Sequence, residues 1–443
     1  MDYYNHERSD SARAMACWSP VKNLFLGMRG QVMTCCFNKS YVLGNYPQQS
    51  LRNIWFGKSR RELTEKLMAY DFSGGCQGCL EAIKARNKSG LTSLKFDHLP
   101  LNASEYPTRM DFELTNECNL ECVMCRGEFS SAIRRNVEKL PPIPTAYGPE
   151  LIKELEEFIP HLTDCHFLGG EPFMIPAYIE IWDMIRKLNP ALRISIITNA
   201  TLLSSRVKEI IEPLDCDICV SIDAATKNTY ERIRRNARFE QVMNNIYYLR
   251  DYTQRKNTRF HLSSCAMREN ASEISLLVKL ANEINCPIFF TRVTYPRAES
   301  LEACSPAELE HVIKLNSPEI SPGENEIQKK NRKTLEELLN HLGVWKTRSE
   351  QRGTIKASTF DEYLAGLKQH LMTEHREDYP GLFTNIESKL FYLLKVAENR
   401  GLRTSAEQKM MEVPYTTLTE MVPGIEKERL VHLFRAYVLP IEI

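Results

Sequence analysis

The chain has 443 residues, 43% of them hydrophobic and 26% charged, so it can bury a large core and is expected to form about two to three domains. Basic and acidic residues number 57 each, which excludes a global field that would attract nucleic acid, an anionic membrane or an acidic substrate. The polar N-terminus lacks a signal-peptide pattern, and no run of about 18 apolar residues occurs. We therefore predict a cytoplasmic protein with no membrane or nucleic-acid partner.

Residues 1–90 carry cysteines and one predicted helix, over residues 51–70. In a reducing compartment, clustered cysteines indicate metal or redox chemistry rather than disulfides. Two separated cysteines and a tight pair supply four thiolates, enough for a fully coordinated metal site that holds either an iron-sulfur cluster or structural zinc. These ligands are Cys17, Cys35, Cys76 and Cys79, with Cys36 as an alternative to Cys35.

Residues 91–108 are predicted to be a connector, after which short β-rich runs alternate with amphipathic helices up to about residue 296. The alternation predicts an α/β fold with a parallel sheet and right-handed crossovers, open or curled into a partial (β/α)6 TIM-like barrel. The predicted strands are residues 109–114, 164–169, 193–198, 217–223, 259–266 and 287–293. Examples of the predicted helices are residues 148–160, 178–188 and 271–284.

The motifs that could take part in catalysis or binding lie at the carboxyl ends of these strands, where such folds place their active sites. A three-cysteine loop follows the first strand, "GGEP" the second and "TNA" the third, and "SIDA" closes the fourth. Strand parity predicts a polar lumen lined by two sets of residues. These are Asp217, Cys219, Ser221 and Asp223 on one strand, and His261, Ser263 and Cys265 on another. The scattered cysteines, such as Cys165, are otherwise expected to be buried apolar residues.

The loop "CNLECVMC" places Cys118, Cys122 and Cys125 within eight residues. A structural zinc site or a ferredoxin-type cluster needs four ligands. Three thiolates could instead hold three irons of one cubane cluster and leave the fourth iron open to a bound molecule. A zinc site or a redox sensor is the alternative interpretation of this loop.

These motifs, in this order, resemble those of the radical S-adenosylmethionine (radical SAM) enzymes, over about residues 109–295. The resemblance implies a 4Fe-4S cluster that binds the amino and carboxylate groups of SAM at its open iron. It also implies reductive cleavage of SAM to a 5′-deoxyadenosyl radical, which takes a hydrogen atom from a C–H bond. The residues that it implies for SAM binding are Met124, Gly169, Gly170, Glu171, Pro172, Asn199, Ser221, Asp223 and Arg234.

Met124 and Arg234 differ from the other residues of this set. Met124 stands where the family usually has an aromatic residue near the adenine, and a thioether can still pack on a purine. Arg234 could pair with the SAM carboxylate, but Arg232 and Arg235 lie beside it, so a solvated basic helix face is the alternative.

The sequences "YVLGN" and "SLRNIWFGKSRRELTEKL" resemble those around the auxiliary cluster of SPASM and twitch domains. Those domains normally follow the barrel, whereas this element precedes it. The resemblance implies an auxiliary 4Fe-4S cluster on Cys17, Cys35, Cys76 and Cys79, and the position of Gly30 favours Cys35 over Cys36. A cluster with four protein ligands can relay electrons, tune a potential or brace the fold.

The predicted domains are an auxiliary-cluster element over residues 1–90, the connector, a radical SAM partial barrel over residues 109–320 and a cysteine-free helical region over residues 321–443. Helices in that last region are predicted over residues 331–345, 359–371 and 385–401.

The expected function is hydrogen-atom abstraction from a peptide or a small polar substrate, such as a sugar or aminocyclitol, giving oxidation, epimerisation or cross-linking. The implied partner is an electron donor of the flavodoxin or ferredoxin type. A redox-neutral outcome would need a hydrogen donor, for which Cys265 or Cys219 are the candidates in the predicted lumen. The alternative is a non-catalytic iron-sulfur electron carrier or sensor on the same fold.

Overall fold

The computed structural model describes residues 1–317 except 7 and 85, and residues 324–352, 359–374 and 379–399. It also describes residues 401, 403–411, 413, 415, 418, 422 and 427. The chain divides into two compact units, one of residues 1–292 with 319–335 and the other of residues 293–318 with 336–443. The predicted domain boundaries near residues 90, 108 and 320 stay predictions.

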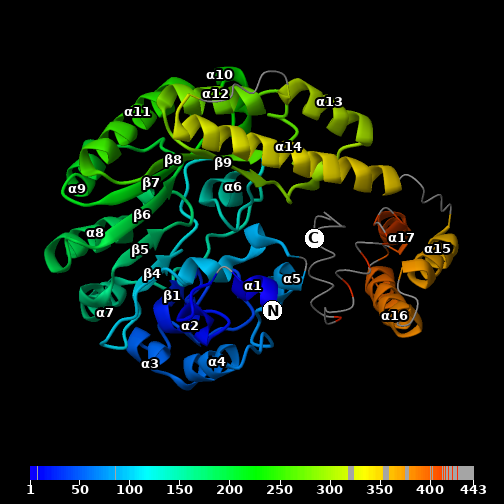
Figure 1. Ribbon diagram of the computed structural model, residues 1–443, viewed down its shortest axis with the longest axis horizontal. Helices are drawn as coiled ribbons and strands as arrows, with labels where there is room; N and C mark the ends of the chain where they lie inside the picture. The colour runs from blue at the N-terminus through cyan, green and yellow to red at the C-terminus, as the bar shows by residue number, and fades with distance from the viewer. Residues whose placement is uncertain are drawn as a thin grey trace. The chain divides into compact units, whose positions relative to one another are not determined.

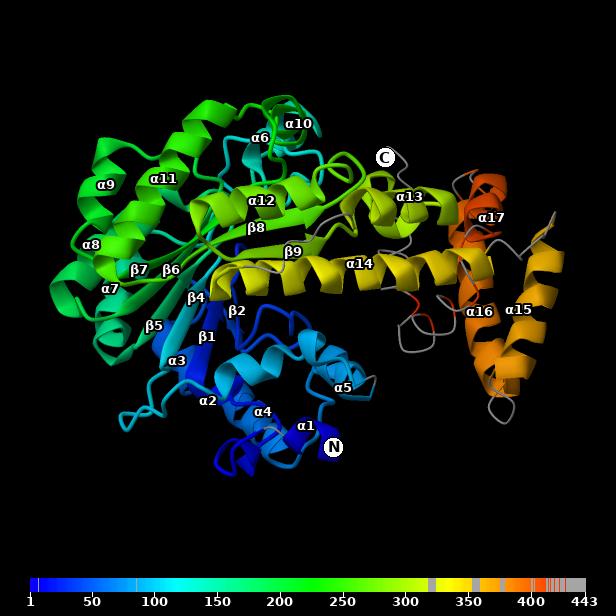
Figure 2. The ribbon, with the colours of Figure 1, turned by 45° about the horizontal axis from the view of Figure 1, so that its top comes forward.

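One nine-stranded sheet organises the first unit, in the order β3-β2-β1-β4-β5-β6-β7-β8-β9. From β4 to β9 all neighbours are parallel and follow chain order, and Figures 1 and 2 show these strands curving as a partial barrel. The predicted α/β fold and all six predicted strands are therefore confirmed. The six strands are β4 (Arg109–Phe112), β5 (Asp164–Phe167), β6 (Arg193–Thr198), β7 (Cys216–Ser221), β8 (Phe260–Ala266) and β9 (Ile288–Arg292).

Helices between the strands cover the outer face of this sheet (Figure 1). Helix α8 shows why, because its apolar residues recur at three- and four-residue spacing and its buried Trp182 packs edge-on against Phe167 of β5. The helices of this region are α6 (Ser131–Asn136), α7 (Pro149–Phe158), α8 (Pro176–Leu188), α9 (Ser205–Ile211), α10 (Lys227–Ile233), α11 (Phe239–Lys256) and α12 (Ile274–Ile284).

Strand β8 alternates between buried and half-buried positions along its whole length. His261, Ser263 and Cys265 are the half-buried residues and face away from the helices, as strand parity predicted. The hydroxyl of Tyr178 lies 2.9 Å from the carbonyl oxygen of Phe112 and 2.8 Å from that of Leu168. It thereby ties together the ends of β4 and β5, where the cysteine loop and the "GGEP" turn begin.

The N-terminal segment joins the same sheet. Strand β1 (Asn23–Leu26) pairs in parallel with β4, while β2 (Gln31–Met33) and β3 (Gly44–Asn45) add antiparallel strands beyond it (Figure 2). These three strands were not predicted. Helices α1 (Asp2–His6), α2 (Ser19–Lys22), α3 (Leu51–Trp55), α4 (Lys58–Met68) and α5 (Gln77–Lys84) complete the segment.

The single helix predicted over residues 51–70 is wrong, because the chain forms α3 and α4 with a break at Phe56 and Gly57. Gly57 is extended, with φ −75° and ψ 171°, and it caps α4. A Cβ atom there would lie 2.6 Å from the carbonyl oxygen of Asn53, so the turn between the helices requires glycine.

The second unit is helical, and the predicted helices over residues 331–345, 359–371 and 385–401 are confirmed within the described residues. Its elements are α13 (Pro306–Asn316), the later part of α14 (Glu326–Arg352), α15 (Phe360–Glu374), α16 (Tyr379–Glu398) and α17 (Arg403–Met411). Leu367, Leu371, Ile386 and Leu390 belong to the buried core that α15, α16 and α17 share. In the part of the chain that the structure describes, no helix has the length and apolar character needed to cross a membrane.

Seven short 3-10 helices are described in the chain. They are η1 (Ala12–Ala14), η2 (Lys88–Gly90), η3 (Thr92–Phe96), η4 (Ile159–His161), η5 (Pro172–Met174), η6 (Arg297–Glu299) and η7 (Leu301–Ala303).

Candidate iron-sulfur and cofactor site

The three-cysteine loop directly follows β4 and is anchored to two helices. The backbone N–H of Cys118 donates to Ser131 Oγ at the start of α6, at 3.1 Å. The N–H of Val123 donates to the carbonyl oxygen of Ile233 at the end of α10, at 2.9 Å. These anchors place all three predicted ligands at the carboxyl end of the sheet.

The thiols of Cys118, Cys122 and Cys125 lie close enough to affect one another's ionisation. Burial raises the pKa of Cys122 to about 12 and that of Cys125 to about 11. Such thiols stay protonated when free and lose their protons on binding a metal. No three cysteine, histidine or acidic side chains among the described residues converge tightly enough to hold a single ion. A cubane cluster does not require such convergence, because each thiolate takes a separate iron.

The "GGEP" turn packs against the cysteine loop through its glycines. Gly169 has a positive φ of 84°, and a Cβ atom on Gly170 would lie only 1.9 Å from the carbonyl oxygen of Glu117. The N–H of Glu171 donates to that same oxygen at 2.6 Å. The glycines therefore allow the two loop backbones to touch, whereas their predicted contact with SAM stays a prediction.

Glu171 holds the "TNA" turn in place beside the cysteine loop. Its fully buried carboxylate accepts hydrogen bonds from the hydroxyl of Thr198 at 2.6 Å and the backbone N–H of Asn199 at 2.7 Å. Burial raises the pKa of this carboxyl. Asn199 Nδ2 in turn lies 3.2 Å from Asn119 Oδ1 and 4.0 Å from the sulfur of Cys118. The carboxylate thus fixes the "TNA" turn beside the cysteine loop.

Arg234 and Asp223 form a buried ion pair beside the same loop. Nε of Arg234 lies 2.7 Å from Oδ2 of Asp223, and the backbone N–H of Cys265 donates to the other carboxylate oxygen at 2.6 Å. Burial opposes the charge of Arg234, but the neighbouring anion of Asp223 outweighs it and raises the pKa of the guanidinium. The solvated helix face considered for Arg234 is therefore wrong. That description fits Arg232, whose exposed side chain pairs with Glu269.

The remaining predicted residues lie around this centre. Ser221 is half-buried at the end of β7, in register with Ser263 of β8. Met124 is half-buried within the cysteine loop, and Pro172 is buried at the start of η5. Their contacts with SAM stay predictions.

The two candidate hydrogen donors differ in exposure. Cys219 is buried in β7, at 7% exposure, whereas Cys265 is half-buried and its sulfur lies 3.3 Å from Thr291 Oγ1. Burial raises the pKa of Cys265 to about 11 and that of Cys219 to about 12, so both carry an S–H hydrogen at neutral pH.

Sequence reasoning missed a buried carboxylate in β4, the first strand of the barrel. Asp111 of β4 accepts hydrogen bonds from Arg109 Nε at 2.8 Å and from Asn23 Nδ2 at 3.0 Å, and its Oδ1 lies 3.6 Å from Nδ1 of His166. Burial opposes ionisation, but His166 and Arg109 outweigh it and lower the pKa of Asp111. An acidic residue in the middle of the predicted strand "RMDFEL", two positions after Arg109, was the available signal.

The second cysteine set also comes together. Cys17 interacts electrostatically with Cys76 and Cys79, and Cys35 interacts with Cys17. Two N–H···S contacts of 3.4 Å support the thiols, from the backbone of Ser19 to Cys17 and from Asn38 Nδ2 to Cys76. These four cysteines are the predicted auxiliary ligands.

Cys35 and Cys36 differ in their surroundings. A hydrogen bond from the Cys36 thiol and the charge of Lys95 outweigh burial and lower the pKa of Cys35. The sulfur of Cys36 lies 4.0 Å from Nζ of Lys95, and this residue is more exposed than Cys35. The arrangement favours Cys35 as the ligand, in agreement with the sequence.

Curated proteins similar to this chain perform several different reactions. An AdoMet-dependent heme synthase of Methanosarcina barkeri is 27% identical over 47% of this chain and 57% of its own length. A probable GTP 3′,8-cyclase of Methanocella arvoryzae is 31% identical over 30% and 40%. The antilisterial bacteriocin subtilosin biosynthesis protein AlbA of Bacillus subtilis is 28% identical over 34% and 32%. The chain thus spans less than two thirds of the length of these relatives.

Solved structures also align with the chain. Streptococcus suis SuiB bound to S-adenosylmethionine aligns over 59% of this chain and 56% of its own, with 13% identity and a TM-score of 0.35.

Two family models match, and each covers one of the two cysteine sets. The model described as the radical SAM superfamily matches residues 112–281, which include the three-cysteine loop and the Asp223–Arg234 pair. The model described as an iron-sulfur cluster-binding domain, named SPASM, matches residues 17–80, which include all four auxiliary cysteines. The first model implies a 4Fe-4S cluster with SAM, and the second implies an auxiliary iron-sulfur cluster. Residues 112–281 are therefore a radical SAM domain, and residues 17–80, which precede it in the chain, match the SPASM domain.

Proposed function

We propose that this protein is an enzyme that cleaves SAM reductively and uses the resulting radical to take a hydrogen atom from a C–H bond of its substrate. The observation that carries the proposal is the three-cysteine loop, held at the carboxyl end of the sheet by the "GGEP" turn and by α6 and α10. When bound, the cluster supplies one electron to the sulfonium of SAM, which breaks a carbon–sulfur bond and releases methionine with a 5′-deoxyadenosyl radical.

The chain's own residues hold and shield this chemistry. Cys118, Cys122 and Cys125 would bind three irons, so a fourth iron stays available for SAM. Arg234 places a fixed positive charge beside these thiolates, because Asp223 holds its guanidinium in a buried position. Glu171 fixes the turn that carries Asn199 by accepting the backbone N–H of that residue.

The lumen favours a substrate with polar groups, either a peptide or a small molecule such as a sugar or aminocyclitol. His261, Ser263 and Cys265 of β8 face it, and Ser221 stands beside them. The named relatives act in heme, GTP and bacteriocin chemistry, so relatives of this chain use widely different substrates. Oxidation, epimerisation and cross-linking are all compatible with such a lumen.

A redox-neutral outcome would use Cys265 as the hydrogen donor. Its thiol carries the needed S–H hydrogen and is more accessible than that of Cys219. Donation would move one hydrogen atom from the sulfur to the substrate radical and leave a thiyl radical, which one electron from the external reductant and one proton from solvent would return to the thiol. That reductant is a flavodoxin or ferredoxin type of protein, and a cytoplasmic location belongs to the same proposal.

The test is an anaerobic assay of the reconstituted protein with SAM and dithionite, read by mass spectrometry of 5′-deoxyadenosine. The wild type should form the nucleoside, and Cys122→Ala should not. Cys216→Ala is the matched control, because it removes a buried thiol from β7 that lies outside both cysteine sets. A wild type with filled clusters that forms no nucleoside would overturn the proposal and favour the non-catalytic electron carrier.

The donor role of Cys265 has its own measurement. In D2O the thiol exchanges its hydrogen, so a product made through Cys265 should carry deuterium at the attacked carbon. Cys265→Ala should abolish this deuterium while the nucleoside is still formed. Deuterium that survives in the variant would exclude Cys265 as the donor.

A further inference from the structure

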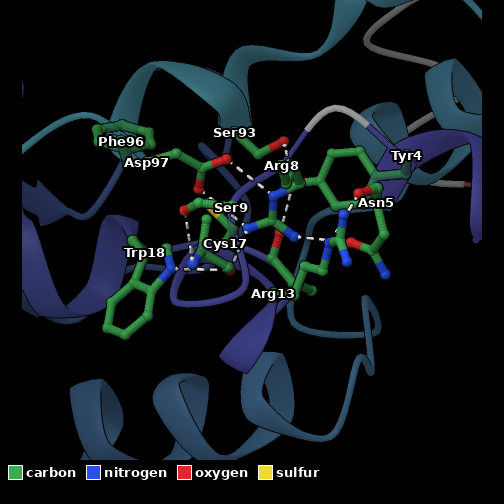
Figure 3. A network of polar contacts seen from close by, with 12 residues as sticks. Tyr4, Asn5, Arg8, Ser9, Arg13, Cys17, Trp18, Ser93, Phe96 and Asp97 are labelled. Atoms are coloured by element: carbon green, nitrogen blue, oxygen red, sulfur yellow. Dashed lines mark hydrogen bonds and ion pairs between the residues drawn. The ribbon is translucent and has the colours of Figure 1, made fainter.

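A polar network fixes the chain just before the first auxiliary cysteine (Figure 3). The guanidinium of Arg8, at 5% exposure, makes two hydrogen bonds to the carboxylate of Asp97, at 2.8 and 3.0 Å. It also donates to the carbonyl oxygens of Ala12 and Met15. The backbone leading into Cys17 is thereby tied to a segment that lies some eighty positions further along the chain.

Tyr4 strengthens the same connection. Its hydroxyl lies 2.6 Å from the carbonyl oxygen of Ala16 and 2.8 Å from Ser93 Oγ (Figure 3). Residues 92–97, made of η3 and Asp97, therefore form one wall of the auxiliary site, although they lie beyond the SPASM match. The sequence analysis predicted that these residues belong to a connector over residues 91–108.

This wall holds a buried ammonium group near Cys17. Lys22 is 4% exposed, and its Nζ donates to the carbonyl oxygens of Phe96 at 3.0 Å and Asp97 at 3.4 Å. The same ammonium stands 4.6 Å from the ring centroid of Trp18. Lys22 interacts electrostatically with Cys17, so its charge acts on that ligand.

Residues 92–97 supply a second ammonium group, that of Lys95, which lies beside Cys36. Nζ of Lys95 lies 4.0 Å from the sulfur of Cys36 and 4.8 Å from the ring centroid of Phe96. Its charge also acts on Cys35 and on Asp111 of β4. The charge of Lys95 therefore acts both on an auxiliary cysteine and on the first strand of the barrel.

We propose that Lys22 and Lys95 raise the reduction potential of the auxiliary cluster that the four cysteines would hold. A buried positive charge on Lys22 and an exposed one on Lys95 both favour the more negative, reduced form of a cluster, and net charge is one of the properties that set its potential. The inference rests on the proposed function for the identity of the cluster. It goes further by naming the residues that tune the potential of that cluster.

The experiment isolates the auxiliary cluster from the SAM cluster. A parent variant with Cys118→Ala, Cys122→Ala and Cys125→Ala keeps only the four auxiliary ligands. Iron and sulfide are counted after anaerobic reconstitution, and the midpoint potential is measured by redox titration followed by electron paramagnetic resonance. No SAM and no substrate are required.

Lys22→Met and Lys95→Met, each added to this parent, should both make the midpoint potential more negative at unchanged iron content. Lys95→Arg keeps the charge and should restore the parent value. Lys84→Met is the matched control, because it removes an exposed lysine from α5. It should leave the potential unchanged.

Equal potentials in the parent, Lys95→Met and Lys22→Met, at equal iron content, would overturn the proposal. If Lys22→Met loses iron because its buried ammonium is needed for folding, Lys95→Met and Lys95→Arg decide the result. A parent without iron would also overturn it, because the auxiliary cluster itself would then be missing. The nucleoside assay on the wild type reports the proposed function separately.

Discussion

Arg234 and Asp223 join the end of α10 to the end of β7, with Nε of the guanidinium 2.7 Å from Oδ2 of the carboxylate. Both side chains are almost fully buried, with exposures of 8% and 0%. The contact links two features that sequence reasoning had treated separately, the "SIDA" motif and the arginine cluster around Arg234. It also sets a permanent charge beside the three-cysteine loop.

Arg234→Met should lower the free energy of unfolding by about 3–5 kcal/mol, because it leaves the carboxylate of Asp223 buried without its partner. Urea unfolding of the apo-protein measures the change. Arg232→Met is the matched control from the same helix end, since its exposed pair with Glu269 contributes about 0–1 kcal/mol. Equal losses in the two variants would contradict a special role for the buried pair.

Gly170→Ala should disrupt the cysteine loop, because the new Cβ atom would overlap the carbonyl oxygen of Glu117. Overpacking of this kind costs about 1–3 kcal/mol, and here the strain falls on backbone that positions Cys118. Reconstituted Gly170→Ala should therefore hold less iron and unfold at a lower temperature. Gly343→Ala serves for comparison, because its Cβ atom meets nothing within 4 Å in α14 and should stabilise the helix by about 0.5–1 kcal/mol. Full iron content in Gly170→Ala would refute the steric argument.

Asp111→Asn should destabilise the protein in a pH-dependent manner. The pKa of Asp111 lies below its ordinary value in the folded protein, so its ionisation stabilises the fold above about pH 4. That contribution disappears as the pH falls towards the lowered pKa. The difference in unfolding free energy between wild type and variant should thus be largest near pH 7 and shrink by pH 3. Asp10→Asn, at an exposed carboxylate, should show no such trend, and a constant difference for Asp111→Asn would argue against the ion-pair origin.

Cys35→Ser and Cys36→Ser should separate the two neighbouring thiols. Cys35 is buried and interacts with Cys17, so its loss should remove auxiliary iron. Cys36 lies outside this set and should be dispensable for iron binding. Iron analysis of both variants, in the background that lacks the three loop cysteines, gives the answer. Iron loss on Cys36→Ser alone would reverse the assignment.

The barrel was predictable because its signals are local and repeated. In β8 the alternation of His261, Ser263 and Cys265 with apolar residues is a period-two pattern, and the structure shows the same alternation in burial. The motif positions followed from one rule, that parallel strands gather their carboxyl ends at one edge of the sheet. Both cysteine sets could be identified from spacing and from resemblance.

The features that were missed depend on tertiary structure. Strands β1, β2 and β3 have only four, three and two residues, too few for a period to emerge. The break at Gly57 lies inside an otherwise good helical pattern. Arg234 lies beside other arginines in the sequence. Only its contact with Asp223, at the end of β7, distinguishes it from the exposed Arg232. The network from Tyr4 through Arg8 to Asp97 spans residues too far apart for any sequence window.

The ladder between β1 and β4 has a mechanical consequence. Its four register pairs, from Asn23 with Arg109 to Leu26 with Phe112, join the auxiliary region directly to the sheet of the barrel. Cys17 precedes one of these strands and Cys118 follows the other, so the main-chain hydrogen bonds of one ladder connect both cysteine-bearing segments. The distance between the two proposed clusters would consequently depend on this ladder and not on a linker between domains.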